Sequence, residues 1–176
     1  QYQLRNLPNW QNFLLDNGTW YVQFNEANAK PHKAFGKPIT VPGSNSVERA
    51  QYFIEHHLQG FGIPTEELAL IGKTSNEHAE HVFFGQTHNG RKVLNAKLSV
   101  RLSLDGRVVS FSTEVFNHIS LEQVVLDGSE AAAAAMAGLV GTVENVVANS
   151  EVMVLPVPEF ERKRTIFRPV YEVTVY

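Results

Sequence analysis

The densest group of possible metal ligands is residues 77–81, which read Glu-His-Ala-Glu-His. A helical zinc-peptidase motif, HExxH, places two histidines four residues apart on one face, with the glutamate as general base. Here His78 and His81 are three residues apart, and HExxH occurs nowhere in the chain. Residues 72–80 are polar and precede an apolar stretch, so we interpret them as a solvated loop that leads into a strand. In an extended strand, positions i and i+3 point to opposite faces, which argues against a shared metal ion.

Other signatures of catalysis are also missing from the sequence. The chain has no cysteine, which excludes disulfides, thiol catalysis and cysteine-ligated zinc. It has no GxSxG motif and no glycine-rich phosphate loop. His56 and His57 are adjacent, so on a helix they diverge by about 100° and cannot share a metal ion. One alternative is a small enzyme with a site built from scattered residues, or a metal-binding protein that uses His78 and His81.

Length and charge restrict the partners. The 176 residues suffice for one medium domain or two small ones. The formal net charge is −3, from 15 basic and 18 acidic residues, which gives no reason to expect a nucleic-acid partner. The one basic run, residues 162–164, is framed by Glu159 and Glu161 and is typical of a solvated hairpin tip. No apolar run approaches the roughly 20 residues of a membrane helix, so we expect no membrane partner.

The first half of the chain predicts one helix and a meander of strands. Residues 1–40 are rich in turns, and residues 19–24 have strand composition. Apolar residues then recur every three or four positions from Val47 to Phe61, which predicts an amphipathic helix. Residues 81–86 and 96–104 follow as strands, the latter with strict apolar and polar alternation. The tight turns expected around them are formed by Asn89, Gly90, Asp105 and Gly106.

The second half repeats this plan in smaller form. A helix is predicted from Gly128 to about Leu139, with an interruption at Gly141. Residues 152–157 and 166–175 have the composition of two strands joined by a polar loop. The sequence therefore predicts an α+β fold with two helix-on-antiparallel-sheet units, of which the second is smaller.

The meander of the first half resembles a known family. Residues 81–111, HVFFGQTHNGRKVLNAKLSVRLSLDGRVVSF, resemble the core of the fungalysin/thermolysin propeptide (FTP) domain. The Asn-Gly and Asn-Ala pairs are closer to the fungalysin type, whereas residues 90–93 read Gly-Arg-Lys-Val where the family usually has Gly-Ile-Pro-Val. The matching residues are His81, Val82, Phe83, Gln86, Thr87, Asn89, Gly90, Val93, Asn95, Ala96, Asp105, Gly106, Val108 and Ser110.

The resemblance extends on both sides of this block. The preceding helix, with Val47, Ala50 and Phe53, is similar to that domain, while residues 129–141 and 169–175 look like its small PepSY-like companion module. The resemblance implies three segments: an N-terminal strand and turn segment (1–40), an FTP-like domain (41–118) and a PepSY-like module (119–176). Both units would then be cystatin-like.

The function that the resemblance implies is that of a prodomain of a secreted zinc metallopeptidase. Such a prodomain is not an enzyme: it assists folding of the catalytic domain and inhibits it, and the zinc lies in that partner. We expect a secreted, periplasmic or extracellular location and no cofactor in this chain. Without cysteine, inhibition cannot use a thiolate on the zinc, so we expect steric blocking by a C-terminal segment or by the sheet surface. A histidine or carboxylate that ligates the zinc in trans is another route.

The candidate contact residues come from the family-like block. For contacts with the partner we select Phe84, Gln86, His88, Asn89 and Val93. Among aromatic residues, Phe53, Phe83 and Phe111 are expected in the core, and Trp10, Trp20 and Tyr21 are candidates for an interface. The alternative function is a free-standing secreted protein-binding module of a larger cell-surface protein. A domain with HExxH following Tyr176 in a precursor would favour the prodomain.

Overall fold

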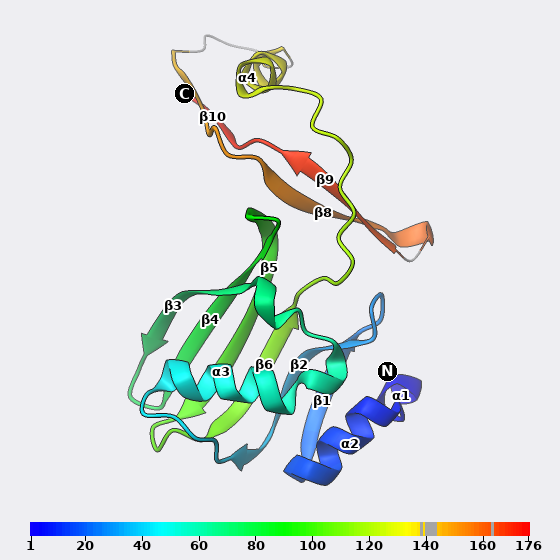
Figure 1. The fold of residues 1–176 in the computed structure, drawn as a ribbon, viewed down its shortest axis with the longest axis vertical. Coiled ribbons are helices and arrows are strands. Elements are labelled where there is room, and N and C mark those ends of the chain that lie inside the picture. Colours follow the sequence, from blue (N-terminus) through cyan, green and yellow to red (C-terminus); the bar gives the residue numbers. More distant parts are fainter. Residues whose placement is uncertain (138, 140–143, 163) are drawn as a thin grey trace. The chain divides into compact units, whose positions relative to one another are not determined.

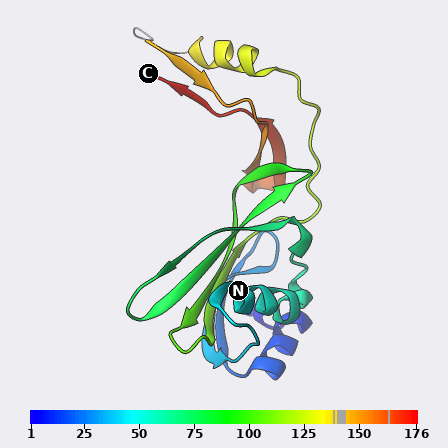
Figure 2. The ribbon, with the colours of Figure 1, turned by 60° about the vertical axis from the view of Figure 1, so that its left-hand side comes forward.

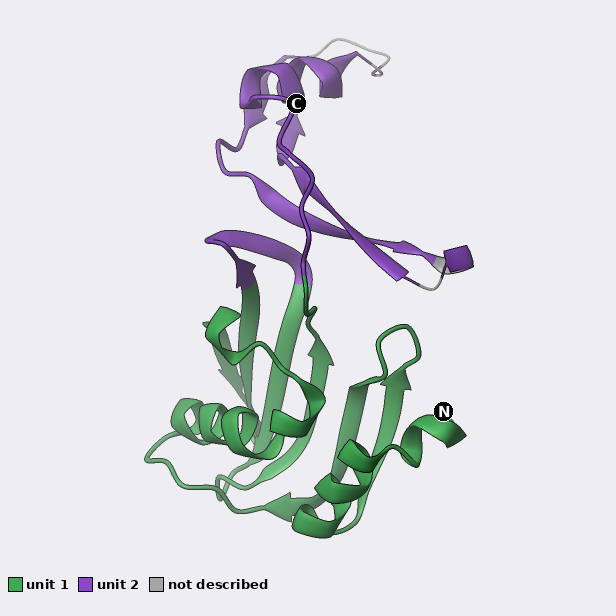
Figure 3. Cartoon of the chain, turned by 45° about the vertical axis from the view of Figure 1, so that its right-hand side comes forward, with its two compact units in different colours: residues 1–86, 96–118 green, residues 87–95, 119–176 purple. Residues whose placement is uncertain are grey.

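The computed structural model describes residues 1–137, 139, 144–162 and 164–176 (Figure 1). The chain divides into two compact units (Figure 3). Unit 1 comprises residues 1–86 and 96–118, and unit 2 comprises residues 87–95 and 119–176. Residues 1–40, which composition sets apart, therefore lie in unit 1. No helix among the described residues is long and apolar enough to cross a membrane.

Unit 1 is built on an antiparallel sheet in the strand order β1-β2-β6-β5-β4-β3. Its helices α2 and α3 lie on one side of this sheet, and the other side carries no helix of unit 1 (Figure 2). The elements are α1 (Tyr2–Arg5), α2 (Pro8–Asn17), β1 (Trp20–Asn25), β2 (Lys30–Ile39), α3 (Ser46–His57), β3 (Leu68–Ser75), β4 (Ala79–His88), β5 (Arg91–Ser103) and β6 (Val108–Glu114), with short 3-10 turns at Gln59–Phe61 and Thr65–Glu67.

Helix α3 follows from its apolar periodicity and from its ends. The side chain of Asn45 accepts a hydrogen bond from the backbone N–H of Glu48 at 3.0 Å, which caps the first turn. Gly62 adopts a left-handed conformation with φ 60° and ends the 3-10 turn that follows α3. The buried face of α3 includes Ala50 and Phe53, both 0% exposed. The helix predicted from the sequence is thus confirmed.

The core of unit 1 lies between the helices and the inner face of the sheet. The apolar positions of β5 alternate as predicted, and Leu98, Val100 and Leu102 are each 0% exposed. Several aromatic side chains fill the space between these strands and the helices. The buried aromatic residues of this cluster are Trp10, Phe13, Trp20, Phe24, Phe53, Phe61, Phe84 and Phe111.

Two parts of unit 1 differ from the sequence prediction. Residues 72–80, predicted as a loop, are mostly strand: β3 continues to Ser75 and β4 begins at Ala79. Helix α2 lies in a segment predicted as strand and turn. Its inward face is formed by the buried Trp10 and Phe13 and by Leu14, which is partly buried against the core. These three residues lie within five positions, which is too short a pattern to identify a helix.

Unit 2 contains α4 (Gly128–Met136), β7 (Val146–Ala148), β8 (Met153–Glu159), β9 (Arg164–Val170) and β10 (Val173–Val175). Strands β8 and β9 form a hairpin, β8 also pairs in parallel with β5 at Val93 and Val154, and β10 pairs with β7. The predicted helix is confirmed up to Met136. The predicted strand 166–175 is divided into β9 and β10. The interruption expected at Gly141 lies outside the described residues.

Helix α4 begins with a complete capping box. The Asp127 carboxylate accepts hydrogen bonds from the backbone N–H groups of Ser129 at 2.8 Å and Glu130 at 2.9 Å. The Glu130 side chain in turn accepts one from the Asp127 N–H at 2.8 Å. The hydrogen bond from the Ser129 hydroxyl, together with those from the Glu130 and Ser129 N–H groups, holds the pKa of Asp127 below its usual value. The local sequence alone therefore accounts for the start of α4.

Candidate interaction surface

The Glu-His-Ala-Glu-His segment forms a turn and the start of a strand. The side chain of Asn76 accepts hydrogen bonds from the backbone N–H groups of His78 and Ala79, both at 2.9 Å, which closes the turn between β3 and β4. His78 is 74% exposed and contacts Glu77 at 3.2 Å, while His81 lies in β4. Among the described residues, no three histidine or acidic side chains are arranged to hold a metal ion. This segment therefore positions a hairpin.

The turn between β4 and β5 displays two of the candidate contact residues. Asn89 and Gly90 have φ angles of 50° and 76°, the left-handed pair that a two-residue hairpin turn requires. The Nε2 atom of His88 lies 3.2 Å from Nδ2 of Asn89. Asn89 and Gly90 are exposed and His88 is half-buried, so a partner can reach this tip.

The turn between β5 and β6 is fixed from both sides. Gly106 has φ 81°, and a Cβ there would lie 1.7 Å from the guanidinium of Arg49. Asp105 accepts hydrogen bonds from Arg107 at 2.7 Å and from the hydroxyl of Ser103 at 2.5 Å. These hydrogen bonds lower the pKa of Asp105 to about 2. The Asp-Gly pair thus serves the turn itself.

The other three candidate contact residues point inward. Phe84 and Val93 are each 2% exposed, and Gln86 is 1% exposed. Val93 lies opposite Val154 of β8, within unit 2. A partner cannot reach these side chains in the folded chain. Of the five candidate contact residues, His88 and Asn89 are accessible to a partner.

Gln86 instead joins β4 to the segment after β6. Its Nε2 donates to the backbone oxygen of Phe116 at 2.6 Å and to Oε2 of Glu67 at 2.8 Å. Its Oε1 accepts from the backbone N–H of Phe116 at 2.9 Å. The amide therefore pairs with Phe116 as a neighbouring strand would. We call this arrangement the Gln86 clamp.

A buried lysine holds the same end of unit 1. The ammonium of Lys30 donates to the backbone oxygens of Gly62 at 3.3 Å and Val115 at 3.4 Å, and to Oδ1 of Asn117 at 2.9 Å. Lys30 is 8% exposed, and no carboxylate among the described residues pairs with it. Burial lowers the pKa of Lys30 to about 8. The ammonium is thus bound by neutral oxygens alone.

The pKa of Lys30 predicts a specific dependence of stability on pH. Because the pKa falls from 10.5 to about 8 on folding, the unfolded chain binds more protons between these values, so this group makes stability rise with pH there. We expect wild type to gain on the order of 2 kcal/mol over Lys30→Met between pH 7.5 and 10. Urea unfolding of both proteins at each pH measures the difference between their free energies of unfolding. The contributions of the other titrating groups are the same in both proteins and cancel in this difference. Parallel pH profiles would contradict this assignment.

The outer side of the unit 1 sheet exposes a row of side chains across four strands. Tyr21 of β1 pairs with Phe35 of β2, Phe35 pairs with Ser110 of β6, and Ser110 pairs with Arg101 of β5. Directly paired residues point to the same face of a sheet. The adjacent row, which includes Val22, Ala34 and Val100, is buried and faces the helices. The row from Tyr21 to Arg101 therefore faces outward.

A second outward row runs beside the first. Gln23 pairs with Lys33, Lys33 with Ser112 and Ser112 with Ser99, and the two serine hydroxyls are 2.8 Å apart. We call the outward side chains of these rows, with Lys97 next to Ser99 along β5, the open sheet face. It comprises Tyr21, Gln23, Lys33, Phe35, Lys97, Ser99, Arg101, Ser110, Ser112 and Glu114, which pairs with Lys97.

Two of the expected aromatic interface residues are placed differently. Trp10 and Trp20 are 2% and 4% exposed and belong to the core. Tyr21 is 63% exposed and stacks on Phe35, which is 53% exposed, with ring centroids 5.5 Å apart. Phe83, expected in the core, is half-buried and stacks on His81. Alternation along β1 explains why Trp20 is buried and Tyr21 is exposed, since these two residues point to opposite faces of the sheet.

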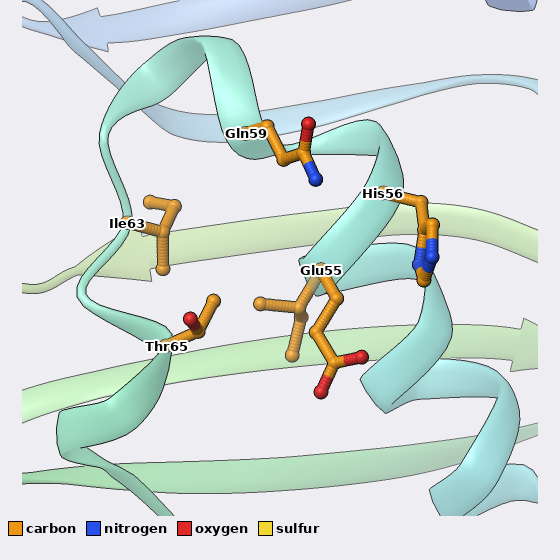
Figure 4. A pocket seen from close by; sticks show the side chains of 6 residues that line it. Glu55, His56, Gln59, Ile63 and Thr65 are labelled. Atoms are coloured by element: carbon orange, nitrogen blue, oxygen red, sulfur yellow. The ribbon is translucent and has the colours of Figure 1, made fainter.

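A surface pocket of about 390 Å³ lies at the end of α3 (Figure 4). Figure 4 shows Ile63 and Thr65 on one side of it and Glu55 and His56 on the other. Its histidine is engaged by its own helix, because Nδ1 of His56 lies 3.0 Å from the Tyr52 oxygen and the two rings stack 3.9 Å apart. The pocket thus shows no poised acid–base pair, and the open sheet face is the stronger candidate surface.

Comparison with protein families matches the middle of unit 1. The family model described as the Fungalysin/Thermolysin Propeptide Motif matches residues 73–115. Residues 73–115 carry the FTP motif. The FTP motif runs from the last residues of β3 to the end of β6, so it includes Gln86, both tight turns and the centre of the open sheet face.

Further comparisons show only distant likeness. Among solved structures, the C-terminal domain of Bacillus megaterium YpeB matches with a TM-score of 0.44 and 14% identity, over 99% of this chain and 85% of that chain. No curated protein matches the chain. The FTP motif is therefore the comparison that bears on function.

Proposed function

We propose that this chain is the prodomain of a secreted zinc metallopeptidase, which assists folding of the catalytic domain and then inhibits it. The FTP motif at residues 73–115 is the observation that carries this proposal. A domain of this family is a non-catalytic part of a peptidase precursor. In this role the zinc belongs to the catalytic domain, and the chain acts where that domain is exported.

The proposal includes a plan for the whole chain. Residues 41–118 form the FTP-like domain, residues 119–176 form a PepSY-like module, and both are cystatin-like units. Residues 1–40 are an N-terminal segment, which contributes β1 and β2 to the sheet of unit 1. The capping box of α4 and the pairing of β8 with β9 support a helix-and-sheet module in the second segment.

Inhibition in this proposal is non-covalent and independent of cysteine. The chain has no cysteine, so its blocking contacts cannot include a thiolate on the zinc. A chaperone of this kind has to present a preformed surface to a partner that is still folding. The central strands of unit 1 meet this requirement, because their core is tightly packed and their turns are fixed by local hydrogen bonds.

Refolding of the catalytic domain tests the chaperone part. The metallopeptidase catalytic domain from the same source is unfolded in guanidinium and diluted with or without an equimolar amount of this chain. We expect the yield of active enzyme, measured after the chain is removed by limited proteolysis, to increase several-fold. Serum albumin at equal mass serves as the control for non-specific effects. An unchanged yield together with undiminished proteolysis in the presence of the chain would refute the proposal.

A further inference from the structure

The open sheet face carries an excess of positive charge. Lys33, Lys97 and Arg101 are exposed, and none forms an ion pair among the described residues. The carboxylate on this side is Glu114, which lies opposite Lys97 and contacts Nδ1 of His32. The chain as a whole has a formal net charge of −3, so this excess is local.

Aromatic side chains lie in the same rows as these cations. Tyr21 and Phe35 stack on each other and occupy the same row as Arg101, with the small Ser110 between Phe35 and Arg101. Tyrosine and arginine are, with tryptophan, the residues enriched at the energetic centres of protein interfaces. The ammonium groups of Lys33 and Lys97 supply further hydrogen-bond donors on this face.

The positive charge of the open sheet face indicates which kind of protein surface can bind to it. In a two-fold dimer through this face, residues near the axis would meet their own copies, which brings like charges together. A basic partner would meet the same repulsion. A partner surface rich in carboxylates would instead pair with all three cations. The charges thus favour an acidic protein surface.

We propose that the open sheet face docks onto an acidic surface of the peptidase catalytic domain, with Tyr21, Phe35 and Arg101 at its centre. This inference rests on the proposed prodomain function and specifies its contact surface. Lys33 and Lys97 act at the rim, where unpaired charges mainly accelerate association. Binding through this face therefore weakens as salt concentration rises, since rim charges are screened.

Charge reversal of the open sheet face, with a matched control, tests the docking surface. We expect Arg101→Glu to raise the Kd for the purified catalytic domain at least tenfold at low salt, and Lys33→Glu to slow association several-fold. Lys73→Glu is the control, because Lys73 is an exposed cation of the same sheet that pairs with the buried Val82 and points to the helix side. It should change the Kd less than twofold.

The outcomes separate the two proposals. Biolayer interferometry at low and high salt gives Kd and rates, and circular dichroism melting confirms that each variant is folded. Wild-type affinity in both Arg101→Glu and Lys33→Glu would overturn the docking surface but leave the prodomain proposal intact. Absence of binding by the wild type would overturn both. A wild-type homodimer in sedimentation that Arg101→Glu dissociates would assign the face to a second copy instead, and so overturn this inference.

Discussion

Replacing Trp10 with alanine is expected to lower the free energy of unfolding of unit 1 by about 3–5 kcal/mol. Trp10 is 2% exposed and is one of the two buried residues of α2. Its ring stacks on Phe13 at 5.2 Å and packs edge-on against Phe24 at 5.8 Å. Alanine would leave a large cavity between α2 and β1. The residues around Trp10 are rigid aromatic rings, so they cannot rearrange to fill it.

Urea unfolding followed by fluorescence measures this effect, because the chain has 2 tryptophans and Trp20 remains as the probe. Tyr2→Ala is the control in the same N-terminal segment, since Tyr2 is 80% exposed and should change stability by less than about 0.5 kcal/mol. A loss below about 1 kcal/mol for Trp10→Ala would show that α2 is not part of the unit 1 core.

Removing the Gln86 clamp is expected to have the next largest effect. In Gln86→Leu the interior keeps a side chain of similar size, but the hydrogen bonds to Phe116 and Glu67 are lost. We expect a loss of about 2–4 kcal/mol in the free energy of unfolding, measured by urea titration. Gln51→Leu, the same substitution at an exposed position of α3, should change stability by less than about 0.5 kcal/mol.

Gln86→Glu separates hydrogen bonding from packing. The new carboxylate would lose the Nε2 donor and would face the carboxylate of Glu67 and the backbone oxygen of Phe116. Both neighbours raise its pKa in the folded state, so the defect should shrink as pH falls and the new group takes up a proton. A defect that is independent of pH would mean that the amide contributes through shape alone.

The sequence predicts those helices and turns that are specified by neighbouring residues, such as a capping side chain or a turn dipeptide. Helix α3 follows from its periodic apolar residues and from Asn45, and α4 follows from Asp127 and Glu130. The turn at Asn89 follows from the tolerance of Asn-Gly for positive φ. Each of these signals lies within a few residues of the structure that it specifies, so the sequence displays it directly.

Signals that depend on distant partners are not visible in the sequence. Strand β3 contains a register shift between Leu70 and Gly72, so its side chains do not alternate regularly. Gln86 resembles any other polar residue of a strand until Phe116, 30 positions later, is placed beside it. From the sequence alone, Lys30 would be placed on the surface, as most lysines are. Its burial depends on Gly62 and Val115, whose backbone oxygens are brought to its ammonium by the fold.

The candidate surface was predictable only in part. The family-like block covers β4, β5 and part of β6, but Phe84, Gln86 and Val93 within it are interior residues. The exposed aromatic anchors, Tyr21 and Phe35, come from residues 1–40, outside the FTP motif. In the sheet β2 pairs with β6, and β1 pairs with β2. No pattern within residues 1–40 predicts the pairing with β6.

Titration of the active metallopeptidase catalytic domain with this chain tests the central claim most directly. We expect hydrolysis of a fluorogenic peptide to fall to near zero at an equimolar ratio, with a dissociation constant below micromolar. Activity should return when the chain is degraded. Full activity with the chain in micromolar excess would contradict the claim that this chain inhibits a metallopeptidase.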